Sequence, residues 1–82
     1  MIDPADYYLD ITADLCPMTF VRTKLLVERM KSGEVAEIRL KGREPLANVP
    51  RSVAELGHTV ESCTAEPGEA AEGIHRLRIR KA

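Results

Sequence analysis

Apolar and polar residues alternate with a period of two in four short stretches of the chain. This alternation predicts four β-strands with one buried face each, over residues 7–12, 34–41, 59–64 and 74–81. The residues that share the predicted inner face are Tyr7, Leu9 and Ile11 in the first strand, Ala36, Ile38 and Leu40 in the second, and His75, Leu77 and Ile79 in the last. In the third strand, Cys63 is expected on the same side as Thr59 and Glu61.

Two further stretches repeat their apolar residues at helical spacing. The first helix is predicted to begin near Pro17 and to end at Ser32-Gly33, because proline favours the first helical position and glycine the position just past the end. Its predicted core stripe consists of Phe20, Thr23, Leu26, Val27 and Met30. The second helix is predicted over residues 46–56, with Leu46, Val49, Val53 and Leu56 on its inner face.

The second helix contains a proline, which restricts where it can begin. Pro50 is expected in its first turn or at its start, with Asn48 as a cap and Gly57 just past its end. The complete order is β-α-β-α-β-β. It predicts an α+β two-layer sandwich in which both helices pack on one face of a four-stranded mixed sheet.

Composition and charge limit the class of protein. We expect residues 1–82 to form one domain, with residues 1–6 flexible. The chain is 44% hydrophobic and 30% charged, which indicates a globular chain, and its net charge of −1 argues against nucleic-acid binding through bulk charge. No apolar run reaches the roughly 18 residues of a membrane span, and the acidic N-terminus lacks the apolar core of a signal peptide. We therefore expect a cytoplasmic location, and we also expect a monomer.

The candidate reactive residue is Cys16, which directly precedes Pro17. At the N-cap of the first helix or one residue before it, a thiolate would face unpaired N–H groups and the positive end of the helix dipole, both of which lower a cysteine pKa. The alternative is a small buried cysteine that closes a strand–helix turn. Cys63 is distant, and His58 and His75 do not complete a zinc site. We therefore predict no metal, no cofactor and intermolecular chemistry at Cys16.

A second apolar cluster lies on the first helix, on the face that begins beside Cys16. It consists of Met18, Val21 and Leu25, with Arg22 and Arg29 next to it. An exposed apolar patch with basic edges is typical of a surface that docks a partner protein. The alternative is that sheet and loops cover these residues.

The predicted outer face of the sheet is rich in basic residues. They are Arg39 and Lys41 in the second strand and Arg76, Arg78 and Arg80 in the last. We favour an ordinary solvated face on which the arginines pair with the acidic residues Asp10, Glu37 and Glu61. The alternative is weak contact with RNA phosphates or with an acidic protein.

The order of elements, with Cys-Pro at the start of the first helix, resembles the TusA/SirA-like sulfurtransferase family from Tyr8 to Arg80. The segments that carry this resemblance are Leu9-Asp10, Leu15-Cys16-Pro17, Asn48-Val49-Pro50-Arg51 and Gly57-His58-Thr59-Val60. The family motif is Cys-Pro-x-Pro, and here Thr19 stands where the family has the second proline.

The resemblance implies a small sulfur carrier, a sulfurtransferase without a cofactor. A cysteine desulfurase or a rhodanese would place sulfur on Cys16 as a persulfide, and an acceptor protein would take it for tRNA thiolation, molybdenum-cofactor assembly or sulfur oxidation. Pro17 would act as the structural partner of Cys16, and Thr19 would add an N–H donor that proline lacks. Asp14 would oppose thiolate formation unless its carboxylate points away.

Two other functions stay open. A regulatory or interaction module on the same fold would not need Cys16, so a serine in its place would leave function intact. A redox protein that uses Cys16 together with Cys63 would need their Cα atoms within about 7 Å.

Overall fold

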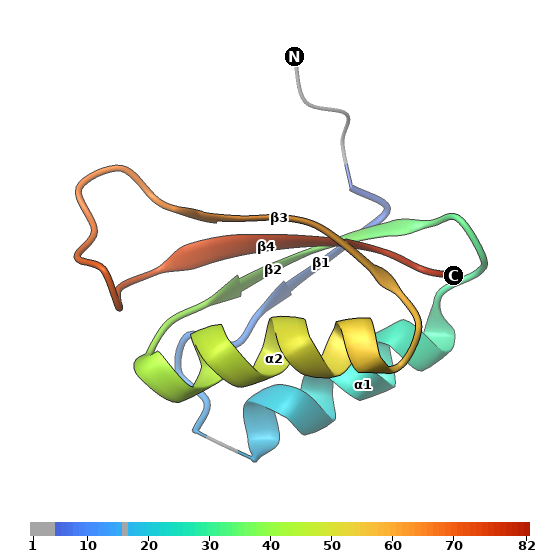
Figure 1. Ribbon diagram of the computed structural model, residues 1–82, viewed down its shortest axis with the longest axis horizontal. Coiled ribbons are helices and arrows are strands. Elements are labelled where there is room, and N and C mark those ends of the chain that lie inside the picture. Colours follow the sequence, from blue (N-terminus) through green and yellow to red (C-terminus); the bar gives the residue numbers. More distant parts are fainter. Residues whose placement is uncertain (1–4, 16) are drawn as a thin grey trace.

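The computed structural model describes residues 5–15 and 17–82 (Figure 1). Its elements in chain order are β1 (Tyr7–Asp10), α1 (Met18–Arg29), β2 (Val35–Leu40), α2 (Arg43–Glu55), β3 (Thr59–Ala65) and β4 (His75–Arg80). This is the order that the hydrophobic pattern predicts. Within the described residues, none of the helices combines the length and the apolarity needed to cross a membrane.

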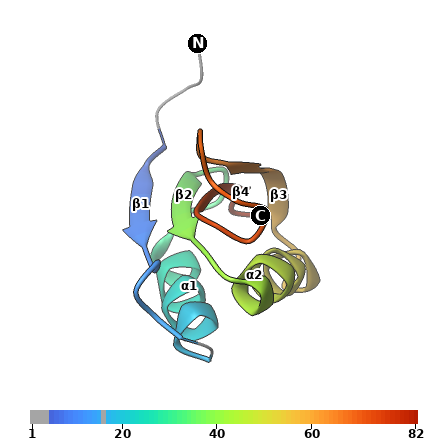
Figure 2. The same ribbon diagram turned by 90° about the vertical axis from the view of Figure 1, so that its left-hand side faces the viewer.

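The four strands form one sheet in the order β1-β2-β4-β3. β1 runs parallel to β2, while β4 is antiparallel to both β2 and β3, so the sheet is mixed. Viewed from the side, both helices lie under one face of the sheet, α1 beneath β1 and β2 and α2 beneath β4 and β3 (Figure 2). The predicted two-layer α+β sandwich is therefore confirmed.

The hydrophobic core lies between the sheet and the two helices and is centred on β2. Ile38 is fully buried, with Leu9 of β1 in register on one side and Leu77 of β4 on the other. The buried core residues are Ile11, Leu26, Val27, Met30, Ala36, Ile38, Leu40, Val49, Val53, Leu77 and Ile79. Burial of each large side chain in such a core contributes about 1.5–3 kcal/mol.

The face that α1 turns toward the core differs from the predicted stripe at two positions, Thr19 and Phe20. Phe20 is only half-buried, whereas Thr19 and Thr23 are fully buried. A buried threonine is tolerated here because the Thr23 hydroxyl donates to the Thr19 carbonyl oxygen at 2.8 Å, which satisfies its polar atom inside the helix. A prediction from apolarity alone therefore placed Phe20 deeper in the core than the structure does.

Both ends of α1 are displaced by small amounts from the prediction. Pro17 is the N-cap residue rather than the first helical residue. The helix ends at Arg29, before the predicted end at Ser32-Gly33, and Met30 has an extended backbone. The Lys81 side chain, from beyond β4, donates from Nζ to the Val27 carbonyl oxygen at 2.8 Å. A cation at this end also suits the negative end of the helix dipole.

The second helix begins earlier than predicted. α2 starts at Arg43 after Gly42, a residue with φ of +102° that glycine adopts without strain. Pro45 in the first turn is compatible with a helix, because the N–H that it lacks has no helical partner there. The expected placement of Pro50 in the first turn is wrong, since it lies inside α2. Asn48 also lies inside the helix, where its side chain accepts a hydrogen bond from Arg51 at 2.8 Å.

The register of β3 on β4 shifts between Val60 and Ser62. Beyond this bulge, Cys63 pairs with the inward-facing Leu77, so Cys63 shares the inner side with Val60 and not with Thr59 as predicted. An extra residue in one strand reverses the alternation that follows it, and the period-two pattern cannot reveal such a shift. Cys63 is nevertheless exposed.

The N-terminal segment that the sequence predicts to be flexible is described only in part. Residues 1–4 lie outside the described residues. The Asp6 N–H donates to the Val35 carbonyl oxygen at 2.8 Å, and the Val35 N–H donates back to the Asp6 carboxylate at 2.9 Å. Asp6 is thereby attached to the start of β2.

Candidate functional site

The candidate site is the junction between the loop after β1 and α1. Cys16, predicted from the sequence to be reactive, lies outside the described residues. Its neighbours in sequence are both exposed: Leu15 ends the loop, and Pro17 caps α1. The bonded neighbours of Cys16 are thus at the surface and at the N-terminus of a helix of 12 residues.

Three backbone donors at the start of α1 are already in use. The Met18 and Thr19 N–H groups donate to the Leu15 carbonyl oxygen at 2.8 and 3.3 Å, and the Val21 N–H donates to the Pro17 carbonyl oxygen at 3.0 Å. The expectation that Thr19 adds a free donor for an anion is therefore wrong. Its N–H instead closes the turn, a bond that the second proline of the family motif could not make.

The Thr19 side chain is fully buried beneath the first turn. It faces the core rather than the surface that Met18 and Leu15 present. Thr19 therefore takes part in the packing of α1.

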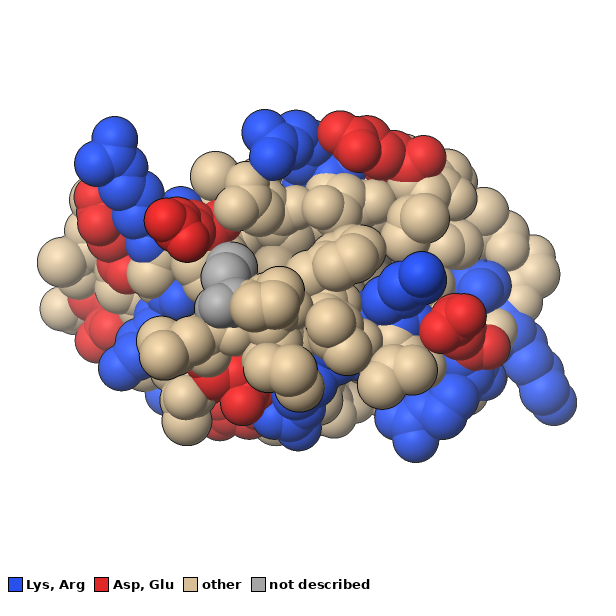
Figure 3. Space-filling model, turned by 90° about the horizontal axis from the view of Figure 1, so that it is seen from below, with Lys and Arg blue, Asp and Glu red and all other residues tan. Residues whose placement is uncertain are grey.

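An exposed apolar row runs along α1 from this junction. It consists of Leu15, Met18, Val21 and Leu25, with exposed fractions of 82%, 49%, 38% and 57%. The prediction that the last three form an exposed patch is confirmed in its exposure, and the alternative that they are covered is wrong. Leu15 was missed because it precedes the helix and so has no place in a helical pattern. Seen from the helix side, residues without charge cover the middle of the surface, with most charged side chains around them (Figure 3).

The basic residues beside the apolar row come from α1 as predicted. Arg22, Leu25 and Arg29 line a shallow groove of about 510 Å³ between α1 and the edge strand β1, which contributes Leu9. Glu28 also lines this groove. The edge of the row is thus mixed in charge rather than purely basic.

Arg22 makes a direct ion pair with Asp14. Its Nη1 donates to the Asp14 Oδ2, and the pair therefore joins a residue before Cys16 in the sequence to a residue after it. Both side chains are partly exposed. The carboxylate that sequence analysis expected to oppose a thiolate is therefore bound to a guanidinium.

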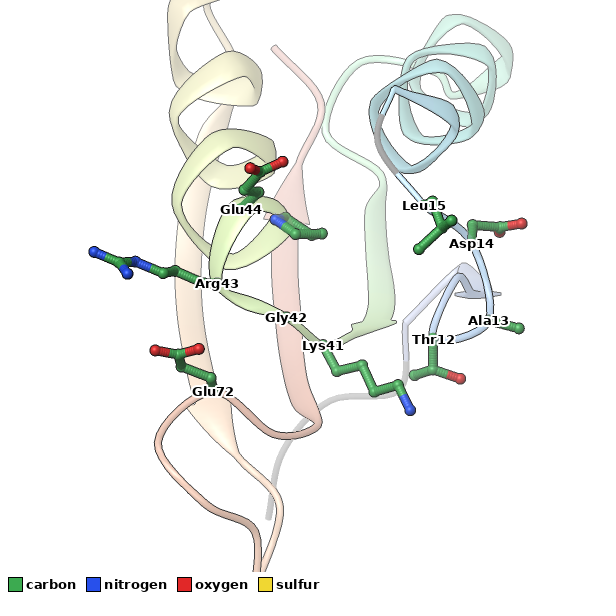
Figure 4. Close-up of a pocket in the computed structure, with 10 residues that line it drawn as sticks. Thr12, Ala13, Asp14, Leu15, Lys41, Gly42, Arg43, Glu44 and Glu72 are labelled. Atoms are coloured by element: carbon green, nitrogen blue, oxygen red, sulfur yellow. The ribbon is translucent and has the colours of Figure 1, made fainter.

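A polar cleft of about 580 Å³ lies on the other side of the junction, between residues 12–15 and residues 41–45 (Figure 4). The Leu15 side chain points into this cleft, while the Asp14 carboxylate points away from it (Figure 4). Lys41 extends from the opposite wall toward Thr12 (Figure 4). The junction is therefore bordered by the apolar row on one side and by this cleft on the other.

The outer face of the sheet carries paired charges. The ion pairs join Arg39 to Asp10 and Glu66, Arg76 to Glu37 and Glu66, and both Arg78 and Arg80 to Glu61. The two arginines that share Glu66 lower the pKa of its carboxyl to about 2. These pairs agree with the favoured prediction of an ordinary solvated face. Glu66 was not predicted as a partner because it lies in the loop after β3.

The second cysteine is a poor candidate for reaction. Partial burial raises the pKa of the Cys63 thiol, so less of it is thiolate at neutral pH. Among the described residues, no cluster of three histidine, cysteine or acidic side chains is arranged to hold a metal ion.

Comparison with known sequences identifies relatives along almost the whole chain. The family model described as sulfurtransferase TusA matches residues 7–81. A candidate sulfur carrier protein of Archaeoglobus fulgidus is 45% identical over 58 residues, which cover 71% of this chain and 66% of that protein. One of Methanocaldococcus jannaschii is 35% identical over 73 residues, which cover 89% of this chain and 91% of that protein. The chain thus spans just under two thirds of the Archaeoglobus relative and nearly all of the Methanocaldococcus one.

A solved structure has the same fold. A SirA-like protein from Desulfitobacterium hafniense superposes with a TM-score of 0.74 at 16% sequence identity. The superposition covers 90% of this chain and 95% of that one. At this identity the match supports the architecture alone.

Proposed function

This chain belongs to the TusA sulfurtransferase family of sulfur carriers, and on that basis we propose that Cys16 accepts sulfur as a persulfide and passes it to an acceptor protein. The donor is a cytoplasmic cysteine desulfurase or rhodanese. The acceptor uses the sulfur for tRNA thiolation, cofactor assembly or sulfur oxidation. The observation that carries the proposal is the Leu15-Cys16-Pro17 motif, whose described residues lie exposed at the start of α1.

The transfer needs no oxidant and no cofactor. The Cys16 thiolate attacks the outer sulfur of a persulfide on the donor protein. A bond forms between that sulfur and the Cys16 sulfur, the donor's own sulfur–sulfur bond breaks, and the donor cysteine leaves as a thiolate. The acceptor repeats the same exchange on the Cys16 persulfide. Thiolate and persulfide anions are both favoured near the positive end of the α1 dipole.

Each partner must bring its own sulfur to bonding distance of Cys16, so its contact surface includes the junction. We place the docking surface on the apolar row, with Arg22 and Arg29 at its edge. The exposure of Met18, Val21 and Leu25 supports this choice, because an apolar centre with a charged rim suits transient protein contacts. Arg22 is bound to Asp14, which leaves Arg29 as the more available cation for an acidic partner.

The test is an intact-mass measurement after incubation with a cysteine desulfurase and cysteine. We expect the mass of one added sulfur atom, which a thiol reductant removes. Cys16→Ser should abolish the gain, and Cys63→Ser should retain it. Absence of the gain in the unmodified chain, with both a desulfurase and a rhodanese as donor, would contradict the proposal. A gain in Cys16→Ser would move the carrier role to another residue.

A further inference from the structure

We propose that two copies of this chain associate through the edge strand β1, in an antiparallel arrangement that joins their two sheets into one. This association goes beyond sulfur transfer and does not depend on it. Three features support it: the free backbone groups of β1, the apolar groove between β1 and α1, and the charges at the two ends of that groove. The monomer expected from the sequence is then the dilute form of the protein.

The first feature is the open backbone of β1. This strand lies at one end of the strand order, so it has a single neighbour, β2, among the described strands. The Ile11 N–H donates to the Arg39 carbonyl oxygen at 2.9 Å, and in a parallel pair alternate residues turn their backbone groups toward the neighbour. Tyr8 and Asp10 therefore direct their N–H and carbonyl groups toward the open edge, which can accept a further strand.

The acidic residues of this segment select one register for two β1 strands. Antiparallel pairing centred on Leu9 places Tyr8 opposite Asp10 of the second copy, and it uses the outward backbone groups of both residues. Pairing centred on Tyr8 would place Asp6 opposite Asp10, and pairing centred on Asp10 would place the two Asp10 side chains together. Like charges directly opposite are unfavourable, so the register centred on Leu9 is preferred.

The second feature is the apolar groove beneath this edge. Leu9, Leu25 and Leu26 line the groove of about 510 Å³ between α1 and β1, and Leu25 is exposed. A two-fold axis perpendicular to the sheet keeps both α1 helices on the same side, because α1 lies beneath β1 and β2 (Figure 2). The two helices then run antiparallel, and Leu9 and Leu25 each face their counterparts. Association thus removes from water apolar side chains that the single chain leaves accessible, including the exposed Tyr8 on the outer face.

The third feature is the balance of charge along the groove, which favours a second copy as its occupant. Arg22, bound to Asp14, lies toward the start of α1, while Glu28 and Arg29 lie at its end. Each end therefore carries one acid and one base. The two-fold axis brings one end against the other, so that Glu28 faces Arg22 of the second copy and Arg29 faces its Asp14. A surface that meets itself in this way has to be self-complementary, and the mixed charge of this groove meets that condition.

The experiment measures molar mass by sedimentation equilibrium with a thiol reductant present. Concentrations run from about 10 µM to about 1 mM, because an interface of modest area associates weakly. The mass should rise from 9.1 kDa toward twice that value. Tyr8→Pro removes an outward N–H at a position where an edge strand tolerates proline, and it should abolish the rise. Leu25→Asp should also abolish it, because two carboxylates then meet at the axis.

The matched control is Leu56→Asp, which makes the same change at an exposed leucine at the end of α2. It should associate like the original chain, and circular dichroism should show the same fold in each variant. The amides of Tyr8 and Asp10 should exchange hydrogen more slowly at high than at low protein concentration.

A mass of one chain at every concentration would contradict the proposed association. Association that persists in Leu25→Asp, or that is lost equally in Leu56→Asp, would show that the contact lies elsewhere or is not specific. Unchanged exchange at Tyr8 and Asp10 in an associated sample would exclude β1 as the contact. The sulfur-loading assay has a separate readout, so the proposed function stands or fails independently of these results.

Discussion

Arg39 and Glu66 form a two-point ion pair across the outer face of the sheet. The Arg39 Nε donates to Oε2 of Glu66 at 2.8 Å, and its Nη2 donates to Oε1 at 3.0 Å. Arg76 donates to the same carboxylate from its Nε at 2.9 Å. This geometry fixes the loop after β3 to the middle of the sheet, and it lowers the pKa of the Glu66 carboxyl from 4.5 to about 2.

A first prediction concerns stability in acid. Because the pKa of Glu66 is lower in the folded than in the unfolded chain, its contribution is present above about pH 4.5 and lost as the pH falls toward 2. Glu66→Gln should therefore be less stable than the original chain at pH 7, and the difference should disappear near pH 2. Urea unfolding midpoints measured across this range test the prediction. A difference that stays constant with pH would show that ionisation of Glu66 is not its source.

A second prediction concerns partner docking on the apolar row. Val21→Asp should slow desulfurase-dependent sulfur loading about five- to tenfold, because a charge replaces an apolar contact near the centre of the interface. Arg29→Glu should also slow loading, by weakening the encounter with an acidic partner. Arg22→Glu should slow it too, although that change also breaks the pair with Asp14. Circular dichroism should show an unchanged fold in each variant.

The control for docking is the opposite face of the sheet. Joint replacement of Arg76, Arg78 and Arg80 by glutamine should leave the loading rate unchanged, because their partners on that face are acidic side chains of the same chain. A large loss of loading there, with normal rates in Val21→Asp, would place the docking surface on the sheet instead of on α1.

A third prediction compares the two thiols. Burial raises the pKa of Cys63, so we expect Cys16 to be alkylated at least about tenfold faster at pH 7. Peptide mass spectrometry of partially alkylated protein measures both rates in one sample. Faster reaction of Cys63 would contradict the argument that the start of α1 activates Cys16.

A fourth prediction concerns Pro50 inside α2. Proline lacks the N–H that would bond to the Leu46 carbonyl oxygen, so Pro50→Ala should restore a helical hydrogen bond. We expect a gain of about 1–3 kcal/mol in the free energy of unfolding. Urea unfolding monitored by circular dichroism measures it. A loss of stability would mean that the packing of Val49 and Val53 depends on the helix shape that proline imposes.

The sequence predicts those parts of the fold that depend on one regular period. The strands β1, β2 and β4 lie where apolar and polar residues alternate in the sequence, because each strand buries one face against the same helices. Leu9, Ile38 and Leu77 are the inward-facing residues at the middle of these strands. The start of α2 was not predictable in this way, since Gly42 and Pro45 are equally compatible with a turn and with a first helical turn. The shift at Val60 and Ser62 is a property of strand pairing, which no single stretch of sequence contains.

The candidate site likewise has features that the sequence predicts and features that it does not. Exposure of Val21 and Leu25 follows from their place on the helical wheel opposite the core. The ion pair between Asp14 and Arg22 does not follow from a helical wheel, because Asp14 lies in a loop. The turn between the loop and α1 determines whether the two side chains point toward each other. The exposure of Leu15 was not predicted for a similar reason, since it depends on the loop conformation and not on a repeating pattern.

The register shift in β3 has a consequence for association between copies of the chain. β3 lies at an edge of the sheet, where a regular strand would offer its free backbone groups to the edge strand of another molecule. The bulge between Val60 and Ser62 interrupts that regular row. A protein that keeps Met18, Val21 and Leu25 exposed gains from this irregular edge, because the irregularity hinders the edge-to-edge strand pairing from which aggregates grow.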